Sequence, residues 1–477
     1  ENCHMTSAIE RVLRLKDNTE VSLSPQQITF AALSSLLKTF ENNRRRMGIS
    51  PGALNRVVVT YPASLLPEPR EQMSETLRQL GIRNVDITFD EAVAPAIFYI
   101  EQRFSDAPEI GPEAFKNQCT FLDDTWFHQI LIIDIGAGTT DIALVQIEMR
   151  ETPARFDAAN GGRIYVIAPR LLGSTGRQHL GGNLITLSLF RCLKLQLSRW
   201  LEQTFGSETA GDHDQTRWQP LADRQSSVTS LDLLKDEPLL REALERAEMI
   251  LPTRFSEVLA TDAESSSERK AQNSARFHAL WEIAEILKIE FSRLLRQQHK
   301  PTELELESFI RPRLTQLFAG TRFEQFLMDE SVQFPSFLRE TFEKAANPVI
   351  DNIKRLADAL TAEAIRRTNQ RESARRSTEV NLAVDSIVLS GRSCQLSLFR
   401  DAIELLVRQK PQFNANQTEV LYQEQYAKLA TAIGALRGQR LVSLAYTDAS
   451  SKELASGQSS RDLDIRNLFF FLPFFFK

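Results

Sequence analysis

Apolar and polar positions along the first hundred residues alternate between a helical period and short continuous apolar runs. Apolar side chains recur every three to four residues in three stretches, and two of these stretches are followed by a glycine, Gly48 or Gly81. The runs between them are typical of buried strands. Helices are therefore expected at residues 24–47, 68–80 and 92–100, and strands at 55–60 and 85–89. This alternation predicts an α/β layer.

The middle of the chain contains a predicted hairpin, LIIDIGAGTTDIALV at residues 131–145. Its two apolar runs flank a corner of small residues: Gly136, Ala137 and Gly138. A corner with so little side chain lets backbone N–H groups approach an anion such as phosphate. Asp134 before the corner and Thr139 after it are placed to hold a hydrated metal beside that anion. From this segment alone, an ordinary glycine hairpin is an equal alternative.

The second half of the chain is predicted to be mainly helical, with two further strands. The expected order is a polar connection at 103–125, a strand at 163–168, a glycine turn at 176–183 and a helix at 184–201. A polar insertion at 203–275 follows, with a helical pattern at 239–251 and an exposed loop at 264–270. Next come helices at 277–295, 311–318 and 332–364, a charged linker at 366–377, a strand at 385–391, and helices at 396–408 and 422–436.

The composition is that of a globular protein long enough for two to four domains: 477 residues, 42% hydrophobic and 25% charged. A net charge of −5 gives no argument for nucleic acid as a partner. The four cysteines are scattered, which fits reduced thiols in a cytosol-like compartment. The apolar run at 468–477 is far shorter than the roughly 20 residues of a membrane helix. It is interpreted as read-through of the gene end, with a short membrane-touching tail as the alternative.

Several short motifs follow one another in a fixed order. They are a strand-Pro-helix unit at 55–80, FDE at 89–91 before an alanine-rich helix, DIGAGTTD at 134–141, HLGGN at 179–183, AEILKIEFS at 284–292 and IVLSGRS at 387–393. Glu285, Lys288 and Ser292 lie at i, i+3 and i+7, so they share one helix face and can reach one ligand. By itself this trio would instead be interpreted as a row of solvent-facing polar side chains.

Taken together, these motifs resemble the ATPase superfamily of actin, heat-shock chaperones, bacterial actin homologues and sugar kinases. The resemblance covers roughly residues 22–440. It implies a two-lobed α/β fold, ribonuclease-H-like, N-terminally incomplete and carrying a helical insertion. The implied domains are the remainder of the first lobe (22–125), the start of the second lobe (126–202), a helical subdomain (203–296), the rest of the second lobe (297–445) and a disordered tail (446–477).

The resemblance also implies ATP and Mg²⁺ as ligands. Glu91 would place the hydrolytic water, Asp134 would hold the metal through water, and Thr139 would assist it. The implied phosphate contacts come from Gly136, Ala137, Gly138, Thr139 and Gly182. The implied adenine and ribose contacts come from Glu285, Lys288, Ser292, Gly391, Arg392, Ser393 and Gln395.

The chain departs from the family pattern at several of these positions. Ala137 replaces the middle glycine of the phosphate turn, and Arg392 replaces the second glycine of the adenosine motif. Gln395 stands where an arginine would stack on adenine, while Ala92 and Ile289 replace a proline and an arginine. The first phosphate hairpin and the hydrolytic lysine of the family are not found. We therefore expect the isolated chain to bind ATP weakly and to hydrolyse it negligibly.

A narrower resemblance is to the SrfB-type virulence-associated proteins of Gram-negative bacteria, through the charged insertion and the SGRS turn at 390–393. The leading hypothesis is a cytoplasmic, ATP-binding, chaperone- or actin-like module whose lobe movement is coupled to a protein partner. The partner would be the missing N-terminal lobe or another virulence-locus protein. The alternatives are a pseudo-ATPase scaffold that acts only through protein contacts and an actin-like filament former.

Overall fold

The computed structural model describes most of the chain between residues 11 and 447. The described ranges are 11–14, 20–48, 54–61, 67–91, 93–105, 111–153, 163–209, 237–254, 263–295, 302–321, 323–327, 331–415, 417–426, 429–441 and 446–447. Residues 448–477 of the expected tail at 446–477 lie outside these ranges, as do two parts of the expected insertion, 210–236 and 255–262. The first two residues of that tail, Tyr446 and Thr447, form a short strand instead of a disordered end.

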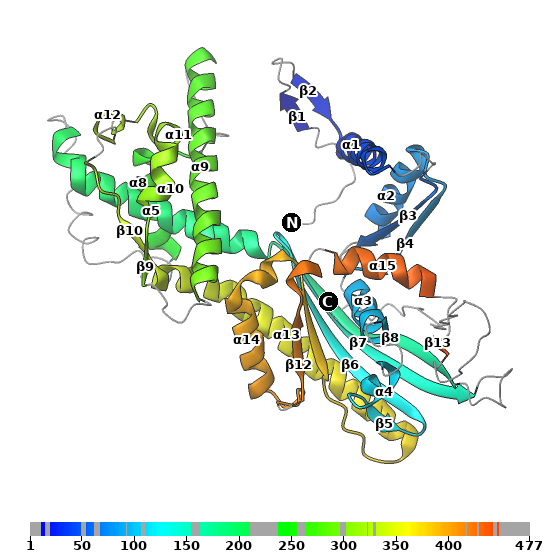
Figure 1. Ribbon diagram of the computed structural model, residues 1–477. Coiled ribbons are helices and arrows are strands. Elements are labelled where there is room, and N and C mark those ends of the chain that lie inside the picture. The colour runs from blue at the N-terminus through cyan, green and yellow to red at the C-terminus, as the bar shows by residue number, and fades with distance from the viewer. Residues whose placement is uncertain are drawn as a thin grey trace.

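A seven-stranded mixed sheet organises the described chain (Figure 1). Its strands are β5 (Thr120–Leu122), β6 (Thr125–Ile135), β7 (Thr139–Pro153), β8 (Arg163–Gln178), β11 (Ser386–Ser390), β12 (Glu419–Tyr422) and β13 (Tyr446–Thr447). The order is β12-β11-β6-β7-β8-β13, with β5 pairing β6. β6, β7 and β8 form antiparallel pairs, whereas β6, β11 and β12 run parallel. The predicted α/β class and the hairpin are confirmed.

Both faces of the sheet are covered, which explains why its central strands are continuous apolar runs. Leu131 and Ile133 of β6 pack into one cluster with α5 (Gly182–Thr209), α13 (Arg339–Arg376) and α14 (Ser397–Gln409). Ile130 and Ile132 point to the other face, against α3 (Ala94–Ser105) and α15 (Ala430–Leu441). Ile132, Ile133 and Ile387 are fully buried in the sheet, as expected from their apolar runs, and Val388 is half-buried.

The N-terminal elements form a separate small layer. They are β1 (Arg11–Arg14), β2 (Glu20–Leu23), α1 (Pro25–Arg46), β3 (Arg56–Tyr61), α2 (Pro67–Gln79) and β4 (Asn84–Asp90). β3 and β4 pair in parallel but outside the central sheet, so Val57, Val58 and Ile87 are half-buried rather than central. β4 leads through Glu91 towards α3, and α15 contacts β3. These two helices therefore connect the small layer to the large sheet.

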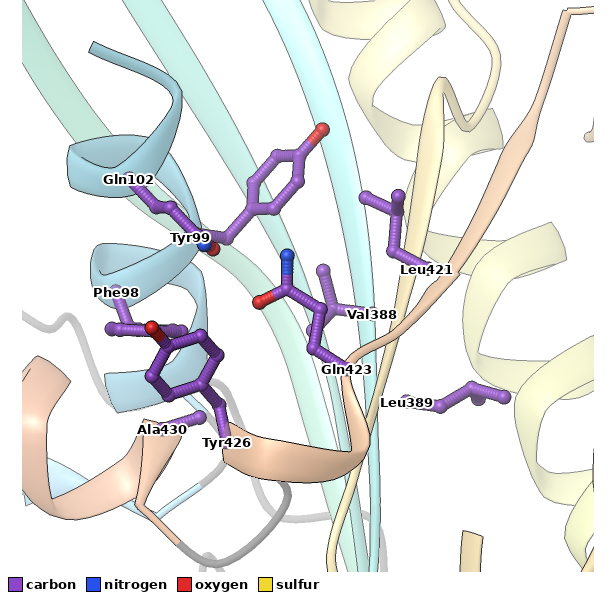
Figure 2. A pocket seen from close by; sticks show the side chains of 9 residues that line it. All are labelled: Phe98, Tyr99, Gln102, Val388, Leu389, Leu421, Gln423, Tyr426 and Ala430. Carbon is purple, nitrogen blue, oxygen red and sulfur yellow. The ribbon is translucent and has the colours of Figure 1, made fainter. Parts of the chain in front are cut away.

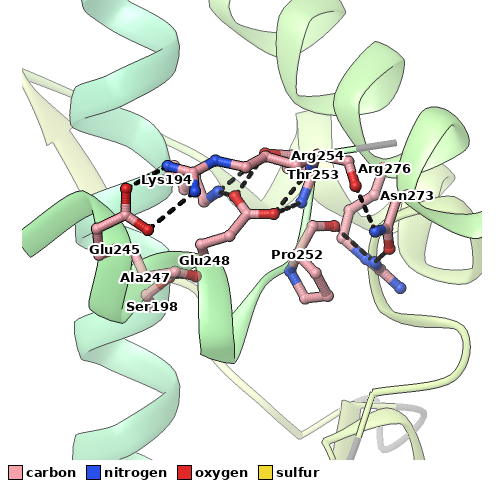
Figure 3. A network of polar contacts seen from close by, with 10 residues as sticks. All are labelled: Lys194, Ser198, Glu245, Ala247, Glu248, Pro252, Thr253, Arg254, Asn273 and Arg276. Carbon is pink, nitrogen blue, oxygen red and sulfur yellow. Dashed lines mark hydrogen bonds and ion pairs between the residues drawn. The ribbon is translucent and has the colours of Figure 1, made fainter. Parts of the chain in front are cut away.

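A helical region extends from the other side of the sheet. It contains α8 (Glu237–Ile250), α9 (Ala263–Leu295), α10 (Glu307–Ile310), the short 3-10 helix η1 (Arg311–Arg313), α11 (Leu314–Phe318) and α12 (Glu324–Leu327), with the strand pair β9 (Glu303–Glu305) and β10 (Ser336–Leu338). A network of polar contacts joins α5, α8 and α9 (Figure 3). Lys194 of α5 donates to Glu248 of α8 and, at 2.8 Å, to the Thr253 hydroxyl. Arg276 of α9 donates to the carbonyl of Pro252 at 2.7 Å.

Four predictions about connecting segments are corrected. The expected loop at 264–270 forms the first turns of α9, and the expected linker at 366–377 is the end of α13. Both segments lack helix breakers, and in the second Arg366 and Arg367 pair with Glu363 one turn away. The polar connection at 103–125 contains α4 (Gly111–Lys116) and β5. The helix expected from residue 422 begins at Ala430, after β12. None of the described helices is long and apolar enough to span a bilayer.

Candidate functional site

The corner between β6 and β7 presents its backbone at the surface. The Gly136 N–H closes the corner by donating to the Thr139 carbonyl at 2.9 Å. Ala137 and Gly138 are exposed, and a Cβ added to Gly138 would meet no atom within 4 Å. The side chain of Thr139 is half-buried. The corner is therefore accessible to an anion at residues 137 and 138.

The turn between β8 and α5 is hydrogen-bonded to this corner. The N–H groups of Gly182 and Asn183 donate to the Gly136 and Ala137 carbonyls at 3.1 and 2.7 Å. A Cβ on Gly181 would lie 2.7 Å from the Gly136 oxygen, so only glycine allows this approach. The Gly182 N–H, expected to contact phosphate, is thus engaged by the protein. The positive end of the α5 dipole still lies against the corner.

The turn after β11 approaches the corner from a third direction. Ser390 pairs in register with Asp134, and Gly391 follows with φ +82°. The Ser393 hydroxyl of the 3-10 helix η2 (Arg392–Gln395) donates to the Gly136 carbonyl at 2.8 Å. Arg392 is exposed. The Gln395 amide lies 3.5 Å from a Glu424 carboxylate oxygen.

The three polar residues of α9, Glu285, Lys288 and Ser292, do not form a solvent-facing row. The buried Lys288 ammonium donates to Thr186 at 2.7 Å and to Glu285 at 2.8 Å, and it lies 3.4 Å from the Gly182 carbonyl. Ser292 is buried, and its hydroxyl accepts the Ser397 N–H at 3.2 Å. Glu285 remains half-exposed. Lys288 thus reaches the start of α5, next to the corner.

Two carboxylates meet at the base of the corner. Burial and the nearby negative charge of Glu91 raise the pKa of Asp134 to about 6, and burial raises the pKa of Glu91. The Thr431 hydroxyl lies 3.3 Å from an Asp134 carboxylate oxygen. A Cβ on Gly434 would overlap the Ala94 carbonyl at 1.9 Å, so α15 is pressed against α3 at this point. This contact fixes Thr431 beside Asp134.

The carboxylates of Asp134 and Glu91 fit a Mg²⁺ ion that is bound together with phosphate groups. Within the described ranges, no group of three or more His, Cys, Asp or Glu side chains could hold a metal by itself. Mg²⁺ usually keeps several waters and is held by one or two carboxylates together with phosphates. The pKa of Asp134 is raised first by burial and second by the charge of Glu91, and a cation there would stabilise the ionised carboxylate against both effects.

Sequence reasoning missed the side chains that support these groups. Thr186 lies one helical turn after Gly182, and this spacing is a local signal that could have been used. Thr431 offers no such signal, because its partner Asp134 is almost three hundred residues earlier. Asp141, the last residue of the DIGAGTTD motif, is buried and pairs in register with Asp134.

A small apolar cavity lies on the α3 side of the sheet (Figure 2). It has a volume of about 30 Å³ and lies between α3, β11, β12, the 3-10 helix η3 (Glu424–Tyr426) and α15. The rings of Phe98 and Tyr426 form part of its wall, with centroids 5.0 Å apart. Ala430, which precedes the Asp134 partner Thr431, also lines it. The cavity is far smaller than the several hundred cubic ångströms of typical ligand pockets, so it cannot take a nucleobase in this conformation.

A scan of protein-family models and a search of curated proteins found no match to this chain.

Proposed function

We propose that this chain binds ATP with Mg²⁺ at the β6–β7 corner and acts as a chaperone- or actin-like module. The observation that carries the proposal is a convergence of distant segments. The turn at 181–182 and the turn at 391–393 both contact the corner at 136–138, and Lys288 contacts the turn at 181–182, although these segments span more than 250 residues. Glycine is needed wherever these backbones approach most closely.

The arrangement of the sheet supports the finer fold in this proposal. Three antiparallel strands, β6 to β8, are followed along the chain by two strands, β11 and β12, that extend the sheet in parallel on the β6 side. This is the order expected for a ribonuclease-H-like lobe. The carboxyl ends of β6 and β11 meet beside Asp134, and such ends are where open α/β sheets bind ligands.

The proposed roles follow from the contacts of each residue. The exposed backbone at Ala137 and Gly138 would donate to phosphate oxygens, helped by the α5 dipole. Asp134 would orient the waters of the Mg²⁺ that accompanies the phosphates, and Glu91 would accept a proton from an attacking water. Lys288 and Glu285 would lie at the edge where the ribose is expected. Binding would change the angle between the large sheet and the small layer, through α3 and α15.

The test places a negative charge on the corner without changing its shape. Gly138→Asp has room for its side chain, and its carboxylate would repel phosphate; Gly138→Asn is the neutral match of the same size. Titration of a fluorescent ATP analogue with Mg²⁺ should show at least about tenfold weaker binding for Gly138→Asp than for Gly138→Asn. Equal affinities of the two variants, or no saturable binding by the unmodified chain, would overturn the proposal.

A pseudo-ATPase scaffold is the second candidate, and one observation favours it. The Gly182 N–H and the Lys288 ammonium, both expected at the nucleotide, are already bonded within the protein. The two candidates differ in turnover. Phosphate release that depends on Mg²⁺ and is lost in Asp134→Asn would favour the ATPase, whereas nucleotide binding without turnover would favour the scaffold.

A further inference from the structure

A larger, polar cavity lies at the opposite end of β11 from the corner. Its volume is about 320 Å³, within the range of small-molecule sites. Its wall comes from the connection between α4 and β5 and from the starts of β11 and β12. Ser386 of β11 lines it, whereas Ser390 at the far end of the strand pairs with Asp134. The cavity is thus separate from the proposed nucleotide site.

The recessed acid in this cavity is Asp385. Its side chain is 22% exposed, and one carboxylate oxygen accepts the Gln129 N–H at 2.7 Å. Within the described ranges, the other oxygen accepts no hydrogen bond from the protein, so it can bind a ligand. The second acid of the wall, Glu419, is already paired with Arg103. Asp385 is therefore the group that would select the charge of a ligand.

The neighbours of Asp385 leave its charge without a permanent counter-ion. His128 lies 3.8 Å away, but its Nδ1 faces the Gln118 carbonyl at 3.0 Å, which can only accept a hydrogen bond. Its Nε2 is 3.0 Å from the Ser386 hydroxyl, which can donate to it. These partners hold the imidazole as the neutral Nδ1–H tautomer. Among the described residues that line the cavity, none is Lys or Arg.

The rest of the wall offers neutral acceptors around this acid. Asn117 contributes an amide group and Thr120 contributes a hydroxyl. The Gln417 amide also lines the cavity, and its oxygen already accepts one hydrogen bond, from the Asn414 amide at 2.5 Å. An ammonium group has three donors and no acceptor, so it matches one carboxylate oxygen surrounded by neutral acceptors. We propose that this cavity binds a small primary amine, whose ammonium group donates to the Asp385 carboxylate.

The experiment titrates three probes against the full chain by saturation-transfer NMR, at a pH above the Asp385 pKa of about 7, where its carboxyl group is ionised. Butylamine carries the ammonium group, 1-butanol is its neutral analogue, and tetramethylammonium is a cation without N–H donors. Butylamine should bind at least about tenfold more tightly than either of the others, because only it can form the charged hydrogen bond. Equal binding of 1-butanol or tetramethylammonium, or no saturable butylamine signal, would overturn the proposal.

Asp385→Asn tests the acid itself, since its amide oxygen can still accept the Gln129 N–H. Butylamine affinity should fall at least about tenfold, whereas Glu404→Gln, the same charge change on the exposed face of α14, should leave it unchanged. Should Asp385→Asn unfold, Asn117→Leu at the exposed rim removes an acceptor and narrows the cavity, and it should also weaken binding. Unchanged affinity in a folded Asp385→Asn variant, or in Asn117→Leu, would contradict the site.

Discussion

Gly391 and Asp134 lie so close that no other residue fits at position 391. A Cβ there would be 2.6 Å from an Asp134 carboxylate oxygen and 2.3 Å from the Ile135 carbonyl. Its backbone, at φ +82° and ψ 151°, is also in a region that is essentially restricted to glycine. This contact joins the end of β11 to the end of β6 at the point where the candidate site begins.

Gly391→Ala should destabilise the fold. The added methyl must displace backbone, and the residue must also adopt a strained conformation, so we expect a loss of about 2–4 kcal/mol in the free energy of unfolding. Urea denaturation followed by circular dichroism measures it. Gly138→Ala is the control, and it should change stability by less than about 0.5 kcal/mol because its Cβ meets nothing. Equal stabilities of the two variants would contradict the contact.

Arg276 is the largest fully buried side chain among the described residues, and its replacement should loosen the helical region. It donates to the carbonyls of Leu317, Pro252 and Ala319, each at 2.7 Å (Figure 3 shows the Pro252 bond). Arg276→Met leaves these carbonyls without their donor, so the free energy of unfolding should fall by about 2–4 kcal/mol. Arg293→Met, in an exposed pair with Glu290, should cost less than about 1 kcal/mol. Similar losses of stability in both variants would contradict a stabilising role for the three Arg276 hydrogen bonds.

The sequence predicted those parts of the site that depend on local rules. Glycine at 136, 138, 182 and 391 and the apolar runs around them are sufficient to predict a hairpin and two further turns, since backbone approach and strand burial leave local signals. The helical end of α13 was missed because its charged residues are stabilised by pairs one turn apart and by packing on β7 and β8. Composition alone made it resemble a linker.

Contacts between distant residues left no local signal. That Thr431 reaches Asp134 follows only from how α15 docks. The pairs of Glu372 with Arg371 and Arg376 are local, but the burial of Glu372 to 2% exposure depends on how α13 packs against the rest of the fold. Glu285, Lys288 and Ser292 of α9 also show what local sequence patterns leave undetermined. Their spacing predicted one shared face, but only the packing against α5 decides that Lys288 points inward.

Two buried glutamines, Gln129 and Gln146, face each other across β6 and β7. Both are fully buried, and their amide atoms have no hydrogen-bond partner among the described residues. Removing both amides should relieve their desolvation, so the Gln129→Met/Gln146→Met variant should gain about 1–3 kcal/mol in free energy of unfolding. The exposed Gln409→Met should change it by less than about 0.5 kcal/mol. A stability loss in the double variant would mean that the amides make a bond that stabilises the sheet.

His128 and Asp385 should give opposite contributions to the pH dependence of stability. Complete burial lowers the pKa of His128 to about 4, so the unfolded chain takes up a proton below pH ~6.5 that the folded chain refuses. Burial raises the pKa of Asp385 to about 7, so the folded chain keeps a proton that the unfolded chain releases above pH ~4. Between about pH 4 and 6.5, acid weakens the fold through His128 and strengthens it through Asp385, and the two slopes offset each other.

Replacing either His128 or Asp385 should reveal the pH dependence that the other residue gives to the free energy of unfolding. In Asp385→Asn, the free energy of unfolding should decrease as pH falls from 6.5 to 4, relative to the unmodified chain, by at most about 1.4 kcal/mol per pH unit. In His128→Gln it should decrease as pH rises from 4 to 6.5 relative to the same reference, because the slope that His128 contributes over this range is lost. Urea denaturation across this range measures both slopes, with Glu404→Gln as the control for net charge. If the free energy of unfolding depended on pH in the same way in all three variants, burial would not shift the pKa of either His128 or Asp385.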